Sequence, residues 1–273
     1  MNLKNHAPFK EKTGGYENMK LIICGKGGSG KSTITALLAR ASVKTGNSVL
    51  VVDTDESNFG LHRQLGVKLP QDFLNYLGGK DVALGKIMAA APDYESVSFF
   101  DEEWQIADIP PEYYSKKNGI KLIAIGKIHD VGEGCACTMS MVAKEFIDKL
   151  ILNSNEVVLV DTEAGIEHFG RAVEKSADAI LMVIDPSYES MKLSEKVLKL
   201  SKNIEKPVFY ILNKVDETNE KFMRDSISNH DMIITTIPNS SSLSVAGLKG
   251  DEITVNSPEI EEMNNLLMEN FRE

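Results

Sequence analysis

A glycine-rich run between an apolar strand and a helix constrains this chain more than any other feature. The run is Gly25–Ser32, with the sequence GKGGSGKS, and the apolar segment Lys20–Cys24 precedes it. After it, Lys31–Thr45 carries apolar residues at helical spacing and stops at Gly46-Asn47. Backbone N–H groups of such a turn, together with the positive end of the helix dipole, bind phosphate groups. The strand–turn–helix order therefore predicts a nucleotide-binding P-loop rather than an ordinary glycine-rich turn.

Individual positions of this loop predict how a nucleotide is held. Gly25, Gly30, Lys31 and Ser32 match the pattern G-x-x-x-x-G-K-S/T. Lys31 can reach the β- and γ-phosphates, and the Ser32 hydroxyl can ligate Mg²⁺. We expect the nucleotide contacts to come from Gly25, Lys26, Gly27, Gly28, Ser29, Gly30, Lys31, Ser32 and Thr33.

Apolar strands alternate with helices along the rest of the chain. Further strands are predicted at Ser48–Val52, Lys121–Ile125, Glu156–Val160, Ala179–Ile184, Val208–Leu212 and Met232–Ile237. Helices are predicted at residues 60–92 with a break at Gly78-Gly79, and at Met139–Leu152, Tyr188–Asn203 and Glu259–Phe271, while residues 93–118 read as irregular. This alternation predicts an α/β fold with a mostly parallel sheet and helices on both faces.

Composition limits the classes of function. Residues 1–18 are polar and predict a disordered extension, followed by a single domain over residues 19–273. A net charge of −10 argues against binding to nucleic acid or to an anionic membrane, and no apolar run is long enough to span a bilayer. Three cysteines, an odd number, argue against a disulfide framework and favour a reducing cytoplasm.

Lys26, directly after the first glycine, makes the loop unusual. The sequence K-G-G-x-G-K-S resembles the deviant Walker A motif of the ATPases that include the nitrogenase iron protein, MinD and ParA. That resemblance implies a homodimer in which Lys26 reaches across the interface to the partner's nucleotide. A lysine there supplies positive charge where the transferring phosphoryl group needs it; the alternative is a solvated loop lysine.

Polar residues follow several predicted strands, where ligands of open α/β sheets bind. Asp53-Thr54-Asp55 ends the second strand, and the class resemblance implies that Asp55 orients or deprotonates the attacking water, with Asp53 as the alternative. Asp161-Thr162-Glu163-Ala164-Gly165 resembles the switch II segment D-T-x-x-G. This resemblance implies that Asp161 holds Mg²⁺ through a water molecule.

Asn213-Lys214-Val215-Asp216 also follows a strand, and it does not by itself decide whether the nucleotide base is adenine or guanine. Taken literally, it is the guanine-reading motif N-K-x-D. In deviant Walker A ATPases an asparagine at this point reads adenine, and a later loop, here Pro238-Asn239, completes the pocket. We favour ATP and ADP, because the lysine-bearing loop outweighs a match of four residues.

Cys135 and Cys137 form a C-x-C pair in the glycine-rich segment GEGCAC. Two thiols one residue apart can face one soft ion, such as Ni²⁺, Zn²⁺, Cu⁺ or an iron–sulfur cluster. Two thiolates are too few for a closed tetrahedral site, and a two-fold axis would supply four. The alternative is a pair of small, partly buried cysteines. Cys24 lies within the first strand and is predicted to be core, while His129 and His168 are ambiguous.

Three runs together resemble one narrower family. They are GEGCAC (132–137), DTEAGIEHFGR (161–171) and the lysine-bearing loop, within a resemblance that covers about residues 19–250. The family is CooC, the ATPases that assist nickel insertion into carbon monoxide dehydrogenase, with a related accessory ATPase of acetyl-CoA synthase. Thr138 and Ser29 depart from the family's usual proline and valine.

The resemblance implies an ATP-hydrolysing homodimer that delivers nickel to carbon monoxide dehydrogenase or acetyl-CoA synthase. Ni²⁺ or Zn²⁺ would be held by Cys135 and Cys137 from both chains. Two alternatives stay open: an iron–sulfur reductase that uses ATP for electron transfer, and a MinD- or ParA-type positioning ATPase. The second needs a basic DNA- or membrane-binding face, and the predicted last helix carries only Arg272 as a basic residue.

Overall fold

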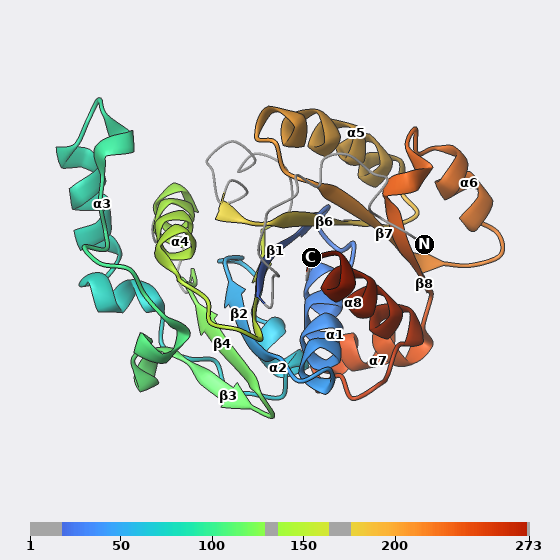
Figure 1. Ribbon diagram of the computed structural model, residues 1–273, viewed down its shortest axis with the longest axis horizontal. Helices are drawn as coiled ribbons and strands as arrows, with labels where there is room; N and C mark the ends of the chain where they lie inside the picture. Colours follow the sequence, from blue (N-terminus) through green and yellow to red (C-terminus); the bar gives the residue numbers. More distant parts are fainter. Residues whose placement is uncertain (1–17, 129–135, 164–175, 272–273) are drawn as a thin grey trace.

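The computed structural model describes residues 18–128, 136–163 and 176–271 (Figure 1). Several predictions fall outside these ranges. They concern the extension 1–17, His129, Cys135, Gly165 and His168.

Within the described residues, eight strands form one sheet in the order β3-β4-β2-β5-β1-β6-β7-β8. The strands are β1 (Met19–Gly25), β2 (Ser48–Asp53), β3 (Ser115–Lys117), β4 (Ile120–Ala124), β5 (Glu156–Asp161), β6 (Ala179–Ile184), β7 (Val208–Val215) and β8 (Ile233–Pro238). All neighbouring pairs are parallel except β3 with β4, which is antiparallel. The carboxyl ends of β1, β2, β5 and β7 therefore meet at one edge of the sheet.

Helices cover both faces of the sheet (Figure 1). The α-helices are α1 (Lys31–Lys44), α2 (Leu61–Gln64), α3 (Lys80–Ala89), α4 (Ala136–Lys149), α5 (Tyr188–Asn203), α6 (Glu220–Asp225), α7 (Ser241–Lys249) and α8 (Pro258–Phe271). Short 3₁₀ helices are η2 (Phe73–Leu77), η3 (Tyr94–Ser96), η4 (Ile106–Asp108), η5 (Pro111–Tyr113) and η7 (His230–Met232). Helices α4 and α5 pack on one face, and α1 and α8 on the other.

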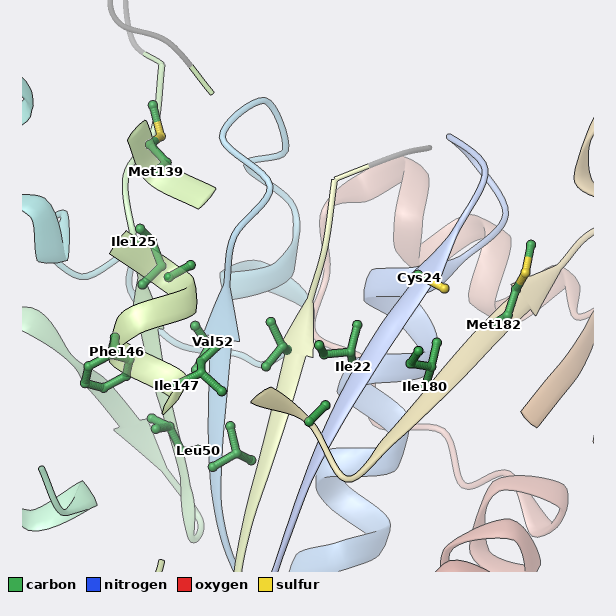
Figure 2. Packing of buried hydrophobic residues seen from close by; sticks show 14 of the residues in the cluster. Ile22, Cys24, Leu50, Val52, Ile125, Met139, Phe146, Ile147, Ile180 and Met182 are labelled. Atoms are coloured by element: carbon green, nitrogen blue, oxygen red, sulfur yellow. The ribbon is translucent and has the colours of Figure 1, made fainter. Parts of the chain in front are cut away.

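Strand residues alternate between two buried apolar layers, one on each face of the sheet. Figure 2 shows the first layer, in which Phe146 and Ile147 of α4 face Leu50 and Val52 of β2. Cys24 of β1 lies in the same layer and is 2% exposed, which confirms that it is a core residue. Because both faces are covered, the inner parallel strands β1, β2, β5 and β6 are apolar at nearly every position, as the sequence predicts.

Two parts of the predicted element pattern are wrong. The break predicted at Gly78-Gly79 is present, since η2 ends at Leu77 and α3 begins at Lys80, but the helix predicted from residue 60 to that break is instead α2, a non-helical stretch and the 3₁₀ helix η2. Gly66 takes a left-handed φ of 71°, and Pro70 disfavours helical geometry at the residue before it, so one continuous helix cannot form. The antiparallel strand β3 lies inside the stretch predicted to be irregular.

Helix α4 begins earlier than predicted, at Ala136 instead of Met139. Its first turn carries small residues outside the apolar stripe, so periodicity does not reveal that turn. Cys137 therefore lies in the first turn of α4 and is half-buried, rather than in the glycine-rich segment before the helix.

Candidate nucleotide and magnesium site

The turn between β1 and α1 has the backbone geometry of a phosphate cradle. Gly30 has φ of +104°, and a Cβ atom there would lie 2.3 Å from Asn213 Nδ2. Gly25 has φ of +148°, and its Cβ would lie 2.4 Å from the Val183 carbonyl oxygen. Both positions therefore require glycine, and the N-terminus of α1 points its unpaired N–H groups toward the turn.

Lys31 and Ser29 lie inside this turn and are buried. The Lys31 ammonium donates to the Lys26 carbonyl oxygen at 3.4 Å, a weak contact that a phosphate can replace. The Ser29 hydroxyl is one of three buried side-chain atoms in the described part of the chain that have no hydrogen-bond partner. A buried, unpaired hydroxyl beside a row of backbone N–H groups fits a polar ligand such as a phosphate.

Four polar side chains, two hydroxyls, one carboxylate and one amide, lie next to the turn. Ser32 Oγ donates to Asp161 Oδ2 at 2.6 Å, and Thr35 Oγ1 lies 3.2 Å from Asp161 Oδ1. Asn58 Nδ2 donates to Ser32 Oγ at 2.8 Å. Ser32 and Asp161, both predicted from sequence to serve Mg²⁺, therefore lie together. Their hydroxyl and carboxylate oxygens, beside a phosphate-binding turn, are ligands that suit Mg²⁺.

Asp161, at the end of β5, is completely buried. Burial raises the pKa of its carboxyl group to about 6, against the opposing effect of the Ser32 hydrogen bond and the Lys31 charge. A bound cation would favour the charged form again, which suits a carboxylate that serves a metal ion.

Asp55 lies in a loop after β2 and is also buried. Its Oδ1 accepts from Ser57 N at 3.1 Å, Ser57 Oγ at 2.7 Å and Asn58 N at 3.1 Å. The carboxylate therefore closes its own turn, the same turn that presents Asn58 to Ser32.

Lys127, which the sequence analysis missed, lies under this loop. It follows β4, its side chain is 0% exposed, and its ammonium forms an ion pair with Asp53 Oδ2 at 2.7 Å. Burial raises the pKa of the Asp53 carboxyl group to about 7, and Lys127 opposes that rise. The available signal was a lysine shortly after the predicted strand Lys121–Ile125, at the sheet edge where the other polar residues gather.

The Asn213 segment contacts the same turn from β7. Asn213 Nδ2 donates to the Ser29 carbonyl at 2.7 Å, and Lys214 Nζ donates to the Gly28 carbonyl at 2.6 Å. Pro238 ends β8 opposite Val215, so the two segments predicted to border the base lie on neighbouring strands. Asp216 Oδ1 accepts from Thr218 and Asn219 backbone N–H groups, so it closes the turn that leads to α6.

Lys26 extends along its own chain to the start of α5. Its Nζ lies 3.4 Å from Ser187 Oγ and 3.9 Å from a Glu189 carboxylate oxygen, and the side chain is 38% exposed. Contacts this long and exposed contribute little energy, so the lysine can leave them for a stronger partner.

The cysteine pair is described only in part, since Cys135 lies outside the described residues. Across residues 18–128, 136–163 and 176–271, no group of three or more His, Cys, Asp and Glu side chains is arranged to hold a metal ion. None of the helices in these ranges is both long and apolar enough to cross a membrane.

Residues 20–253 match the CobQ/CobB/MinD/ParA nucleotide-binding domain family. An uncharacterized ATP-binding protein of Methanocaldococcus jannaschii is 47% identical over 249 residues, which cover 91% of this chain and 99% of that protein. The carbon monoxide dehydrogenase accessory protein CooC of Rhodospirillum rubrum is 30% identical over 236 residues, covering 85% of this chain and 88% of that protein.

A solved structure has the same fold. The septum site-determining protein MinD of Pyrococcus horikoshii, complexed with Mg-ADP, superposes with a TM-score of 0.65 at 17% identity. The match covers 92% of this chain and 96% of that one. The predicted α/β fold with a mostly parallel sheet is thereby confirmed.

Proposed function

The chain belongs to the CobQ/CobB/MinD/ParA family of nucleotide-binding domains as a P-loop ATPase, and we propose that it is a homodimeric accessory ATPase for nickel insertion. Its client would be carbon monoxide dehydrogenase or acetyl-CoA synthase. The observation that carries this proposal is the 30% identity to CooC over most of both chains. The C-x-C pair at Cys135 and Cys137 adds a soft-metal ligand set.

Each residue of the site has its own role in ATP hydrolysis. The turn from Gly25 to Ser32 binds the phosphates, Lys31 neutralises their charge, and Asn213 with Pro238 borders the base. Ser32 and Asp161 would hold Mg²⁺, which supplies further positive charge against the phosphate oxygens. Asp55 receives the proton of the attacking water or orients that water.

Lys26 of one protomer would reach the nucleotide of its partner. Lys26→Ala is then expected to bind ATP within about threefold of the wild-type affinity and to lower kcat by about 1000-fold, in the range of an arginine finger. The reason is that charge acting on the transferring phosphoryl group stabilises the transition state and not the bound nucleotide. ATPase rates and fluorescent-nucleotide titrations measure the two effects separately.

Mixing two inactive variants distinguishes action across the interface from action within one chain. In a mixed dimer, the Lys26→Ala protomer keeps Asp55 and receives Lys26 from an Asp55→Asn partner. Half of the dimers are mixed and each has one intact site, so the rate should return to about a quarter of wild type. No recovery in a mixture shown to contain mixed dimers would place Lys26 on its own chain's nucleotide.

The cysteines would bind one Ni²⁺ or Zn²⁺ per two chains. Equilibrium dialysis of the anaerobic protein is expected to give half an ion per chain for wild type, and none for the Cys135→Ala/Cys137→Ala double variant. Because each thiol must lose its proton to ligate, the affinity should weaken as pH falls. Losing either cysteine removes two ligands from a site on a two-fold axis, so Cys135→Ala alone should abolish metal-linked dimerisation.

Cys24→Ala is the matched control for this experiment. Cys24 is buried in β1 within the core, so its removal should leave the metal stoichiometry unchanged. One ion per chain, or unchanged binding in the double variant, would refute the shared site. An iron–sulfur cluster would instead give visible absorption from the anaerobically purified protein.

A further inference from the structure

The Lys127 ammonium is completely buried, and its three hydrogen bonds all go to one loop. Besides the ion pair with Asp53 Oδ2 at 2.7 Å, it donates to the Asp55 carbonyl at 2.5 Å and to the Asn58 carbonyl at 2.6 Å. These three oxygens match the three N–H donors of an ammonium group. The loop from Asp53 to Asn58 is thus wrapped around a single buried positive charge.

We propose that Lys127 is a positioning residue for hydrolysis, which holds this loop in the conformation that presents Asp55 and Asn58 to the nucleotide site. Two carbonyl oxygens and a carboxylate converge on one point, and their partial and full negative charges repel one another without a cation between them. Removing the ammonium would let the loop open and would shift both side chains.

The loop connects this charge to the magnesium site in two ways. Asn58 accepts from Lys127 through its carbonyl and donates through its side chain to Ser32 Oγ at 2.8 Å. Asp53 is paired with Lys127 through Oδ2 and accepts from the Asp55 backbone N–H through Oδ1 at 3.1 Å. A displacement of the ammonium therefore reaches the Asp55 turn and Ser32 through one or two hydrogen bonds.

The Lys127 backbone is also held by two contacts from outside the loop. The Lys127 backbone N–H donates to Asp72 Oδ2 at 3.1 Å, and its carbonyl accepts from Lys80 Nζ at 2.5 Å. The next residue, Ile128, donates its N–H to the carbonyl of Glu56 in the loop itself at 3.0 Å, so the loop is tied to this segment through the backbone as well. The backbone of Lys127 is thus anchored on both sides, beside β4, which is paired with β2.

Burial of an ion pair is costly, and apolar side chains of similar volume often pack into such places with equal or better stability. Stability alone therefore does not account for a lysine at this position. All three ammonium donors bind oxygens of one loop, and that convergence is what a positioning role explains.

The test compares variants that leave the Lys127–Asp53 pair with and without an unpaired charge, so that an effect on turnover can be separated from an effect on folding. Lys127→Met keeps the length of the side chain but leaves the Asp53 carboxylate buried without its partner, so the melting temperature should fall. The double variant Lys127→Met/Asp53→Asn has no unpaired charge and should melt near wild type. Both should bind a non-hydrolysable ATP analogue within about threefold of wild type, while kcat falls by about 100-fold, the effect of a small misplacement of reacting groups.

Two further variants serve as controls. Asp53→Asn alone, with Lys127 retained, measures what the Asp53 carboxylate itself contributes and should lower kcat less than Lys127→Met. Lys20→Met removes another partly buried lysine, whose ammonium donates to the Ile147 carbonyl at the opposite end of the sheet. It should lower the melting temperature and leave kcat unchanged.

Two results would overturn the proposal. One is a kcat within about twofold of wild type in folded Lys127→Met, since misplacement of reacting groups should cost far more. The other is a kcat that recovers together with the melting temperature in the double variant, which would mean that Lys127 acts only through global stability.

Discussion

Asp55→Asn is expected to bind ATP with nearly wild-type affinity and to lose at least about 100-fold in kcat, the usual contribution of a general base. The asparagine oxygen can still accept from Ser57 and Asn58, which now close the turn on Asp55 Oδ1. The loop therefore keeps its shape, and only the charge and the proton-accepting capacity are lost. Steady-state ATPase assays together with nucleotide titration measure the two quantities.

Two other variants serve as the negative and the positive control for Asp55→Asn. Asp108→Asn changes an exposed aspartate that accepts from the Gln105 backbone N–H, far from the site, and should have no effect on turnover. Lys31→Ala should abolish nucleotide binding, because its ammonium is the buried charge inside the phosphate turn. Equal ATPase rates for Asp55→Asn and wild type would remove Asp55 from the mechanism and leave Asp53 as the candidate.

Asp161→Asn should abolish magnesium-dependent ATPase activity and yet stabilise the nucleotide-free protein. The pKa of Asp161 is about 6 in the folded chain and 3.8 for an ordinary aspartate. Between these values the folded state binds more protons than the unfolded state, so this group's contribution to stability falls as pH rises. Above about pH 6 the buried Asp161 carboxylate is charged, and its raised pKa lowers the free energy of unfolding of wild type by roughly two pKa units, about 3 kcal/mol. An asparagine at this position carries no charge and does not have this cost.

Urea unfolding in EDTA, at pH 4 and at pH 8, measures this difference. The variant should be more stable than wild type by about 2 to 3 kcal/mol at pH 8, and the gap should shrink toward zero at pH 4. Ser32 can still hydrogen-bond to the asparagine side chain, so little packing is lost. A gap of equal size at both pH values would mean that ionisation of Asp161 is not its cause.

The parts of the site that the sequence predicts well are local in the chain. The turn from Gly25 to Ser32 carries its own conformational requirements, since glycine is needed where φ is left-handed and the helix follows directly. The P-loop pattern predicts that Ser32 ligates Mg²⁺, and the resemblance to switch II implies the same ion for Asp161. The two side chains lie together because β1 and β5 are parallel neighbours that end at one edge of the sheet.

The parts that sequence reasoning missed depend on strand order. Lys127 meets Asp53 only because β4 lies next to β2, and Asn58 meets Ser32 only because the loop after β2 folds back over the phosphate turn. Neither neighbour relation can be deduced from spacing or periodicity in a single sequence. The early start of α4 was missed for a different reason, because Ala136, Cys137 and Thr138 add no large apolar side chain before Met139.

Trp104, the single tryptophan of the chain, lies in a cluster of aromatic rings. Its ring centroid is 5.8 Å from that of Phe73, 5.1 Å from Tyr76 and 6.0 Å from Phe146, all edge to face. Phe73 directly follows the Asp72 that anchors Lys127, and Phe146 lies on α4, whose first turn holds Cys137.

Indole fluorescence depends on the polarity and packing around the ring. Here that ring contacts η2, which follows Asp72, and α4, which carries Cys137. The unlabelled protein thus contains a single indole probe that contacts both η2 and α4. Emission recorded during nucleotide addition and during metal addition would show, in real time and without chemical modification, whether either ligand displaces these segments.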